Sequence, residues 1–139
     1  MEVLACPYDK SVTVVVVYKE DEEYEAARPY FEDNLAFAAL GIEPQSMVLD
    51  GEALKEDWFS EDHLLVIMAH ELGHLKNNSC DETEADITGF KILSESGLSE
   101  SAVSLYTTEL QARYGTTFET LTSQNYNIKL PLSKKEEKE

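Results

Sequence analysis

The segment LLVIMAHELGHLKNN, residues 64–78, places two of the chain's three histidines within one apolar run. His70 and His74 are four residues apart, so a helix brings both imidazoles to one face, with Cβ atoms about 6 Å apart. Two nitrogens held in this way can bind one zinc ion at about 2.0–2.1 Å each. Glu71 points about 100° around the helix from His70, which suits a general base better than a ligand. The spacing therefore predicts His70 and His74 as metal ligands and Glu71 as the catalytic base.

A second cluster follows in the sequence DETEADITGFKIL, residues 81–93. On a helix, Glu82 and Asp86 share a face, where two carboxylates repel each other by about 0.2–0.5 kcal/mol. A dication with its imidazoles would offset that repulsion. We predict Glu82 as the third ligand and Asp86 as the acceptor for the outer N–H of a ligand histidine. Glu84 is the main competitor for the ligand role, and stabilisation of the helix N-terminus is the simpler alternative for Glu82.

The two cysteines leave a different zinc site open. Cys80 lies close to Glu82 and could supply an inhibitory fourth ligand, or could join Cys6 and the histidines in a closed Cys₂His₂ site. Closed tetrahedral zinc sites are structural, so the chain would then be a non-catalytic module that acts as a regulatory binding protein. In the absence of such a site, we expect both thiols to be small buried hydrophobic groups.

The roles of one histidine and three tyrosines remain open. His63 lies about 10.5 Å along the helix from His70, too far to bind the same ion. We interpret it as a surface histidine, with a role in lining the cleft as the alternative. Tyr106, Tyr114 and Tyr126 are all candidates for an oxyanion donor, and the sequence does not select one of them.

Strand patterns are found early in the chain. The β-branched segment SVTVVVVY, residues 11–18, predicts a buried strand, and EVLAC, residues 2–6, predicts its hairpin partner across a Pro-containing turn. The shorter, more polar PQSMVLD, residues 44–50, predicts a strand at a sheet edge. Such an edge strand could pair with an extended substrate, but we favour its interpretation as an ordinary strand.

Helical patterns account for most of the rest. Residues 19–41 carry apolar side chains at helical spacing, which Gly41 ends, and Pro29 either kinks this helix or marks its start. Three more helices are predicted from Ser60 to Asn77, from Ser79 or Asp81 to Gly97, and from Ser99 to Gly115. Strands before helices indicate a small single-domain α+β fold over residues 1–130. The charged tail, residues 131–139, is expected to be disordered.

The charge balance limits the partners. The 139 residues include 11 Lys and Arg against 28 Asp and Glu, a net charge of −17. This field repels phosphate backbones and anionic membrane surfaces, so we expect neither nucleic-acid nor membrane binding. A basic or unfolded polypeptide, as substrate or as regulatory partner, fits the charge best. The lack of a signal-like N-terminus and of a disulfide framework favours the cytoplasm.

The two motifs together resemble the HExxH plus ExxAD signature of gluzincin metallopeptidases. The match covers His70-Glu71-Leu72-Gly73-His74 and Glu82-Thr83-Glu84-Ala85-Asp86. HtpX-like and CAAX-prenyl-protease membrane enzymes carry this signature, as do the soluble minigluzincins, and ImmA/IrrE-like proteases have a similar ExxAN form. The resemblance implies a zincin-like fold and a zinc peptidase with ligands His70, His74 and Glu82. It also implies Glu71 as the base that acts on a zinc-activated water, and Asp86 as support for a ligand histidine.

Overall fold

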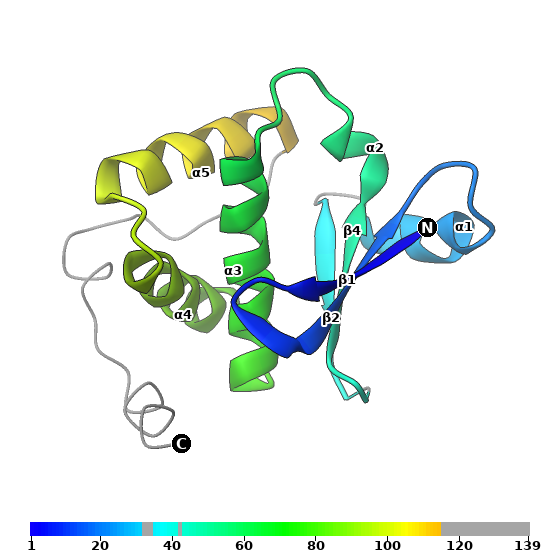
Figure 1. Cartoon of the computed structure of the whole chain (residues 1–139), viewed down its shortest axis with the longest axis horizontal. Helices are drawn as coiled ribbons and strands as arrows, with labels where there is room; N and C mark the ends of the chain where they lie inside the picture. The colour runs from blue at the N-terminus through cyan, green and yellow to red at the C-terminus, as the bar shows by residue number, and fades with distance from the viewer. Residues whose placement is uncertain (32–34, 42, 115–139) are drawn as a thin grey trace.

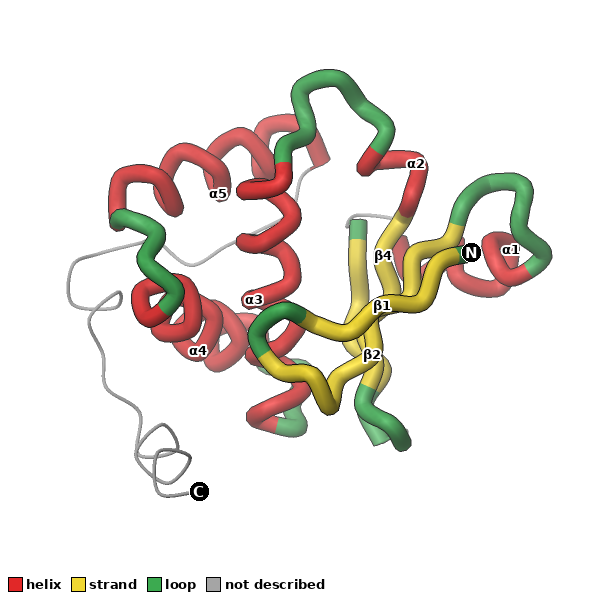
Figure 2. The backbone as a smooth tube through the Cα atoms, in the orientation of Figure 1, coloured by secondary structure: helices red, strands yellow, loops and turns green. Residues whose placement is uncertain are grey.

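A computed structural model describes residues 1–31, 35–41 and 43–114. It confirms the expected α+β fold: a four-stranded sheet is formed early in the chain and is followed by helices (Figure 1). The long helix α3, Glu61–Asn77, lies between the sheet and the two later helices, α4, Glu82–Glu95, and α5, Glu100–Tyr114 (Figure 2). Among the described residues, no helix combines the length and hydrophobicity that a membrane crossing requires.

The sheet has the strand order β1-β2-β4-β3. Strand β1, Glu2–Cys6, pairs antiparallel with β2, Asp9–Val17, which confirms the predicted hairpin. Strand β4, Ser46–Asp50, runs parallel to β2 on one side and antiparallel to β3, Ala36–Ala39, on the other. The prediction of β4 as an edge strand is therefore wrong, and both of its edges are paired within the sheet.

The predicted helix over residues 19–41 is formed only in its first part. Helix α1, Glu23–Ala27, is followed by a 3₁₀ turn, Arg28–Phe31, which contains Pro29. Proline lacks an N–H and clashes with the carbonyl four residues earlier, so an α-helix does not continue regularly through it. The later residues of the segment form β3 instead, because pairing with β4 outweighs the helix propensity of its alanines.

The three later helices lie where the sequence predicts them. The Ser60 side chain caps α3, Asp81 caps α4, and the Ser99 hydroxyl accepts a hydrogen bond from the Ala102 N–H at the start of α5. Asn78 ends α3 in the left-handed conformation, with φ 48°. A short helix, α2, Gly51–Leu54, links β4 to the loop before α3. The tail at residues 131–139 lies outside the described residues.

The main core lies between the sheet and α3. On β2, the alternating residues Val12, Val14 and Val16 face it, as do Met47 and Leu49 of β4. A smaller cluster lies on the opposite face of the sheet, where Phe31 and Ala27 cover Val17. This second cluster covers only part of that face.

The position of His63 near a helix start predicted a surface residue. That prediction is wrong. It is 3% exposed and packs against the rings of Trp58, Phe59 and Tyr106. Its Nδ1 accepts from the Ser60 backbone N–H at 3.0 Å, so Nε2 carries the proton and donates to Glu109 Oε1 at 2.7 Å. His63 therefore joins the start of α3 to α5, away from the predicted metal ligands.

Candidate metal centre

Helix α3 places His70 and His74 one turn apart, with ring centroids 4.9 Å apart and ring planes perpendicular. Both side chains are largely buried, at 8% and 7% exposure. Each ring is fixed through its Nδ1 atom. His70 Nδ1 donates to Asp86 Oδ1 at 2.5 Å, and His74 Nδ1 donates to the Ser79 carbonyl at 2.8 Å. Both Nε2 atoms are thereby turned toward the same space.

Glu82 lies at the point where these two nitrogens converge. Its Oε1 atom is 2.9 Å from His70 Nε2 and 3.2 Å from His74 Nε2. One donor atom from each of the three residues lies within 4.8 Å of the others, close enough to bind one metal ion. Ligand arms of about 2.0–2.1 Å at a tetrahedral angle separate donor atoms by roughly 3.3 Å, so this donor set fits a zinc ion with little rearrangement.

Close packing of α4 against α3 brings the carboxylates to the histidines. A Cβ atom built on Gly73 would meet the carbonyl oxygen of Ala85, and would lie 2.8 Å from the Ala85 Cα. One built on Gly89 would lie 3.1 Å from the Ala69 carbonyl oxygen. The small residues Ala85 and Gly89 therefore permit the close approach of the two helices. The matching role of Gly73 was not predicted.

A side-chain amide also ties the two helices together. Asn77, at the end of α3, donates to the Gly73 carbonyl at 2.9 Å and to the Thr88 hydroxyl at 2.9 Å, and it reaches the Glu84 carbonyl at 3.3 Å. The turn after α3 is thereby fixed to α4. Since this turn includes the Ser79 carbonyl that orients His74, the connection between the helices is itself part of the site.

The charges of the site are strongly coupled. Burial disfavours the protonated form of His70, but the hydrogen bonds to Asp86 and Glu82 and the nearby charge of Glu71 outweigh it and raise the pKa of His70 to about 10. The hydrogen bond from His70 lowers the pKa of Glu82. Burial raises the pKa of Glu71, which is 7% exposed. In the metal-free protein, a proton on His70 therefore supplies the positive charge that the carboxylates require.

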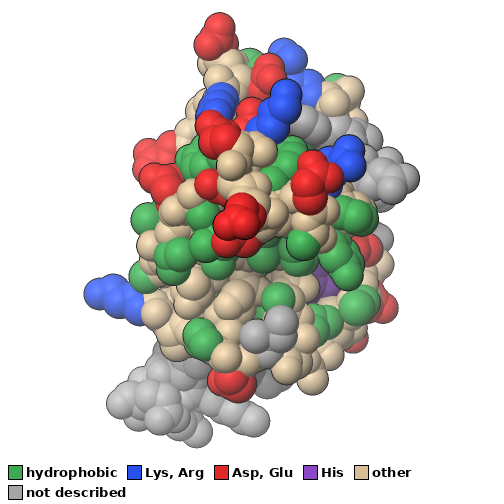
Figure 3. All heavy atoms as spheres, turned by 90° about the vertical axis from the view of Figure 1, so that its right-hand side faces the viewer, with side chains coloured by type: hydrophobic (Ala, Val, Ile, Leu, Met, Phe, Trp, Pro, Cys, Tyr) green, Lys and Arg blue, Asp and Glu red, His purple; other side chains and the backbone are tan. Residues whose placement is uncertain are grey.

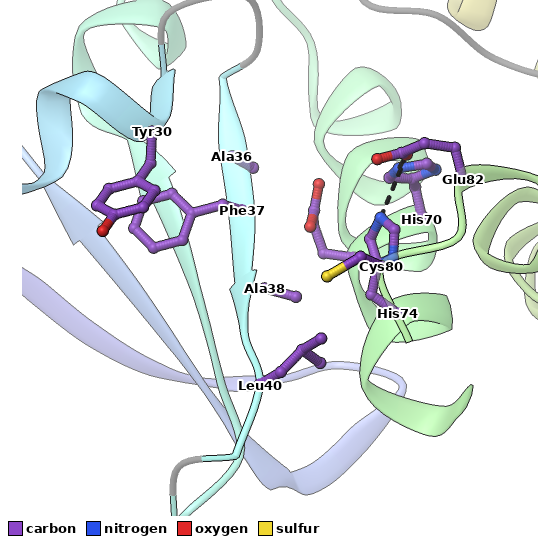
Figure 4. A pocket seen from close by; sticks show the side chains of 10 residues that line it. Tyr30, Ala36, Phe37, Ala38, Leu40, His70, His74, Cys80 and Glu82 are labelled. Atoms are coloured by element: carbon purple, nitrogen blue, oxygen red, sulfur yellow. Dashed lines mark hydrogen bonds and ion pairs between the residues drawn. The ribbon is translucent and has the colours of Figure 1, made fainter. Parts of the chain in front are cut away.

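The predicted ligands line a cleft of about 170 Å³ together with Glu71. Figure 4 shows its two walls: His70, His74 and Glu82 lie on the helical side, and β3 with Ala36 and Ala38 lies opposite. This second wall was not predicted, because the pattern of residues 19–41 indicated a helix where residues 36–39 form a strand. Tyr30 and Phe37, on the far side of β3, also contribute to the lining, as does Leu40.

Several alternatives for the site are not supported. Glu84 is exposed and outside the ligand group, and its backbone N–H is capped by Asp81. Cys6 is fully buried in the main core, and within residues 1–31, 35–41 and 43–114 the three-residue ligand group is the one that His70, His74 and Glu82 form. A closed Cys₂His₂ site is therefore wrong for this fold.

Cys80 and the tyrosines differ from the expectations in other ways. Cys80 is exposed and lines the cleft, so it is not the buried hydrophobic group expected of a free thiol. Tyr106 donates to Asp62 at 2.9 Å and does not line the cleft, so it is not an oxyanion donor. The side chains of Tyr114 and Tyr126 lie outside the described residues.

Replacing Asp86 by asparagine is expected to weaken zinc binding by about 10–100-fold, the range seen when the partner of a ligand histidine is changed. Asparagine keeps the shape but removes the charge that Asp86, 2% exposed, places next to His70 Nδ1. Competition with a fluorescent zinc chelator measures the change. The matched control is Glu84→Gln, which removes a carboxylate from the same helix outside the ligand group. Equal zinc affinities of Asp86→Asn and the unmodified protein would contradict this role.

Comparison with known proteins gave no family: no family model, no curated protein and no solved structure matches the chain.

Proposed function

We propose that this chain is a zinc metallopeptidase of the gluzincin type, with a zincin-like arrangement of sheet and helices. The observation that carries the proposal is the placement of Glu71. This carboxylate is buried, follows a ligand histidine directly, and lines an open cleft whose other wall is a sheet edge. A metal group that served only to hold helices together would not require a buried carboxylate in the adjoining cleft.

His70, His74 and Glu82 would hold the metal. Two imidazoles and one carboxylate form the donor set of open, catalytic zinc sites, whereas closed structural sites are rich in cysteine. When bound, zinc supplies Lewis acidity, which activates water for attack and polarises the substrate carbonyl. Asp86 and the Ser79 carbonyl keep the two Nε2 atoms aimed at the site, so the ligands need little reorganisation.

Glu71 would move the protons. Burial raises its pKa, which brings a carboxylate closer to the pH at which it must both accept and donate a proton. In peptide hydrolysis Glu71 takes a proton from the attacking water and passes it to the nitrogen of the leaving amine. Because it is buried beside the cleft, its carboxylate is poised for this exchange without competing contact with bulk water.

Strand β3 would hold the substrate. Within the described residues it pairs with β4 alone, which makes it an edge strand of the sheet, and it lines the cleft. An extended polypeptide can add to such an edge through backbone hydrogen bonds, which select for extended conformation rather than for sequence. The small side chains of Ala36 and Ala38 leave room for the substrate between β3 and the ligands (Figure 4).

A second candidate is a non-catalytic zinc module that acts as a regulatory binding protein. Glu82 contacts both histidines across the junction of α3 and α4, so a metal at this point would join the two helices whether or not a reaction occurs. The two candidates differ in what they require of Glu71, because a module that only binds does not need a proton carrier in the cleft.

The proposal is tested with the full chain, stripped of metal by a chelator and then reloaded with one equivalent of zinc. A proteome digested with a glutamate-specific protease serves as the peptide library, and mass spectrometry detects new termini. We expect cleavage by the zinc-loaded protein only. A protein that binds one zinc but yields no more new termini than its metal-free form would overturn the peptidase and favour the non-catalytic module.

A further inference from the structure

The sheet face opposite α3 carries a row of apolar side chains across all four strands. The register pairs Val3 of β1 with Val15 of β2, Val15 with Val48 of β4, and Val48 with Phe37 of β3. Paired residues lie on the same face of a sheet, so these four side chains form one continuous strip. Val3 is 62% exposed, and Val15, Val48 and Phe37 are partly exposed. An exposed apolar strip of this kind is typical of a binding surface.

Part of this strip lies in a groove between the sheet and α1. The groove has a volume of about 250 Å³ and is lined by Val15, Val48, Phe37 and, from the helical side, Glu23 and Ala26 among others. On its helical side Glu23 lines the groove. The surrounding residues 20–25, EDEEYE, contain five carboxylates, of which Asp21 pairs with the N-terminal ammonium at 2.8 Å and Glu20 lies 3.9 Å from Lys55. Arg28, the nearest following cation, is held at 3.0 Å by Glu25. Figure 3 shows this side of the molecule, with a band of hydrophobic side chains below a region in which acidic and basic side chains are mixed.

The groove and the catalytic cleft share a border. Tyr30 and Phe37 line both, and their ring centroids lie 5.0 Å apart. Tyr30 is 65% exposed. In Figure 4 the two rings stand on one side of β3, while Ala36 and Ala38 face the histidines on the other. A histidine side chain is also visible among hydrophobic side chains on the face seen in Figure 3. One extended polypeptide can therefore occupy the cleft, cross β3 and enter the groove.

We propose that this groove is an exosite that binds a second segment of the polypeptide substrate, one with apolar residues interleaved with lysine or arginine. The inference rests on the proposed peptidase function and adds the substrate class to it. The valine strip and Phe37 bind the apolar side chains, and Glu23 on the helical wall attracts the basic ones. A second copy of this chain is a poor occupant, since it brings a net charge of −17 to an already acidic wall.

The test uses the zinc-loaded Glu71→Gln protein, so that no probe is cut during the measurement. The probe is a fluorescein-labelled 12-residue peptide of alternating valine and lysine, and the matched peptides alternate threonine with lysine and valine with glutamate. Fluorescence anisotropy is expected to show the Val–Lys peptide binding at least tenfold more tightly than either of the others. Binding should also weaken as salt rises, because the attraction to α1 is exposed to solvent.

Two protein variants locate the binding. Val15→Thr with Val48→Thr keeps the β-branched shape but makes the strip polar, and should weaken Val–Lys binding about tenfold or more. Leu105→Gln is the control, because Leu105 is an apolar residue 53% exposed on α5, outside the groove. Equal affinity for all three peptides, or unchanged binding by the double variant, would overturn the exosite.

Cleavage by the protein with intact Glu71 separates this inference from the peptidase itself. We expect the double variant to cut hexapeptide substrates found in the library as fast as the unmodified protein does. It should cut longer substrates that carry the apolar and basic segment about tenfold more slowly. Equal rates on the long substrates would refute the exosite and leave the peptidase intact. Groove binding with no cleavage of any peptide would refute the peptidase, and with it the role of the groove in substrate selection.

Discussion

Replacement of Glu71 by glutamine is expected to lower kcat by about 10²–10⁴-fold, the range that general acid–base catalysis contributes. Glutamine has nearly the same shape but cannot accept the proton of the attacking water. The metal should remain bound, because His70, His74 and Glu82 form the ligand group without Glu71. Zinc content measured by inductively coupled plasma mass spectrometry, together with kcat on a cleaved library peptide, tests both parts of this prediction.

Glu82→Gln provides the matched comparison. It makes the same chemical change eleven residues later, but it weakens a ligand, so zinc content and activity should fall together. The pair of variants distinguishes a proton carrier from a ligand: Glu71→Gln loses rate and keeps zinc, whereas Glu82→Gln loses both. Full activity of Glu71→Gln would exclude the proposed mechanism, and loss of zinc from Glu71→Gln would mean that Glu71 belongs to the ligand set.

The sequence predicts the ligand group well because helix geometry determines it. Residues four apart on a helix share a face, so the spacing of His70 and His74 is enough to place both rings on one side. The same rule places Glu82 and Asp86 together on the next helix. Sequence spacing alone does not show how closely the two helices approach, and here the small residues at the crossing decide that distance.

The sequence fails where tertiary pairing outweighs local preference. Alanines at residues 36–39 favour a helix, yet β4 offers that segment a partner, with Phe37 opposite Val48. The loss of β3 from the prediction also placed β4 at the sheet edge, a position that β3 occupies in the structure. The half of the cleft built by α3 could thus be read from spacing, whereas the half built by β3 depends on contacts distant in sequence.

His63 shows a second kind of failure. A histidine in the first turn of a helix is usually interpreted as a surface residue. Here the aromatic rings of Trp58, Phe59 and Tyr106 enclose it. Its Nε2–H donates a hydrogen bond to Glu109. Tyr106 and Glu109 come from α5, far later in the sequence, so the local pattern alone could not have indicated the burial.

Gly73→Ala is expected to destabilise the protein and to weaken zinc binding in the same step. The new methyl group would overlap the Ala85 backbone, and backbone atoms cannot move away by changing a rotamer. Overpacking of this kind costs about 1–3 kcal/mol, sometimes more, which exceeds the roughly 1 kcal/mol by which alanine improves on glycine as a helix former. Since α4 carries Glu82 and Asp86, a displaced α4 also moves both carboxylates away from His70.

Gly89→Ala is the graded control, because its methyl group would lie 3.1 Å from the Ala69 carbonyl oxygen, a tight contact without the overlap at Gly73. Both variants add the same group to a buried helical glycine, so the helix-propensity gain cancels between them. Urea unfolding should therefore show Gly73→Ala as the less stable variant, and zinc competition should show it as the weaker binder. Equal stability and equal zinc affinity of the two variants would contradict this explanation. The contact of Gly73 with Ala85 would then not set the distance between the histidines on α3 and the carboxylates on α4.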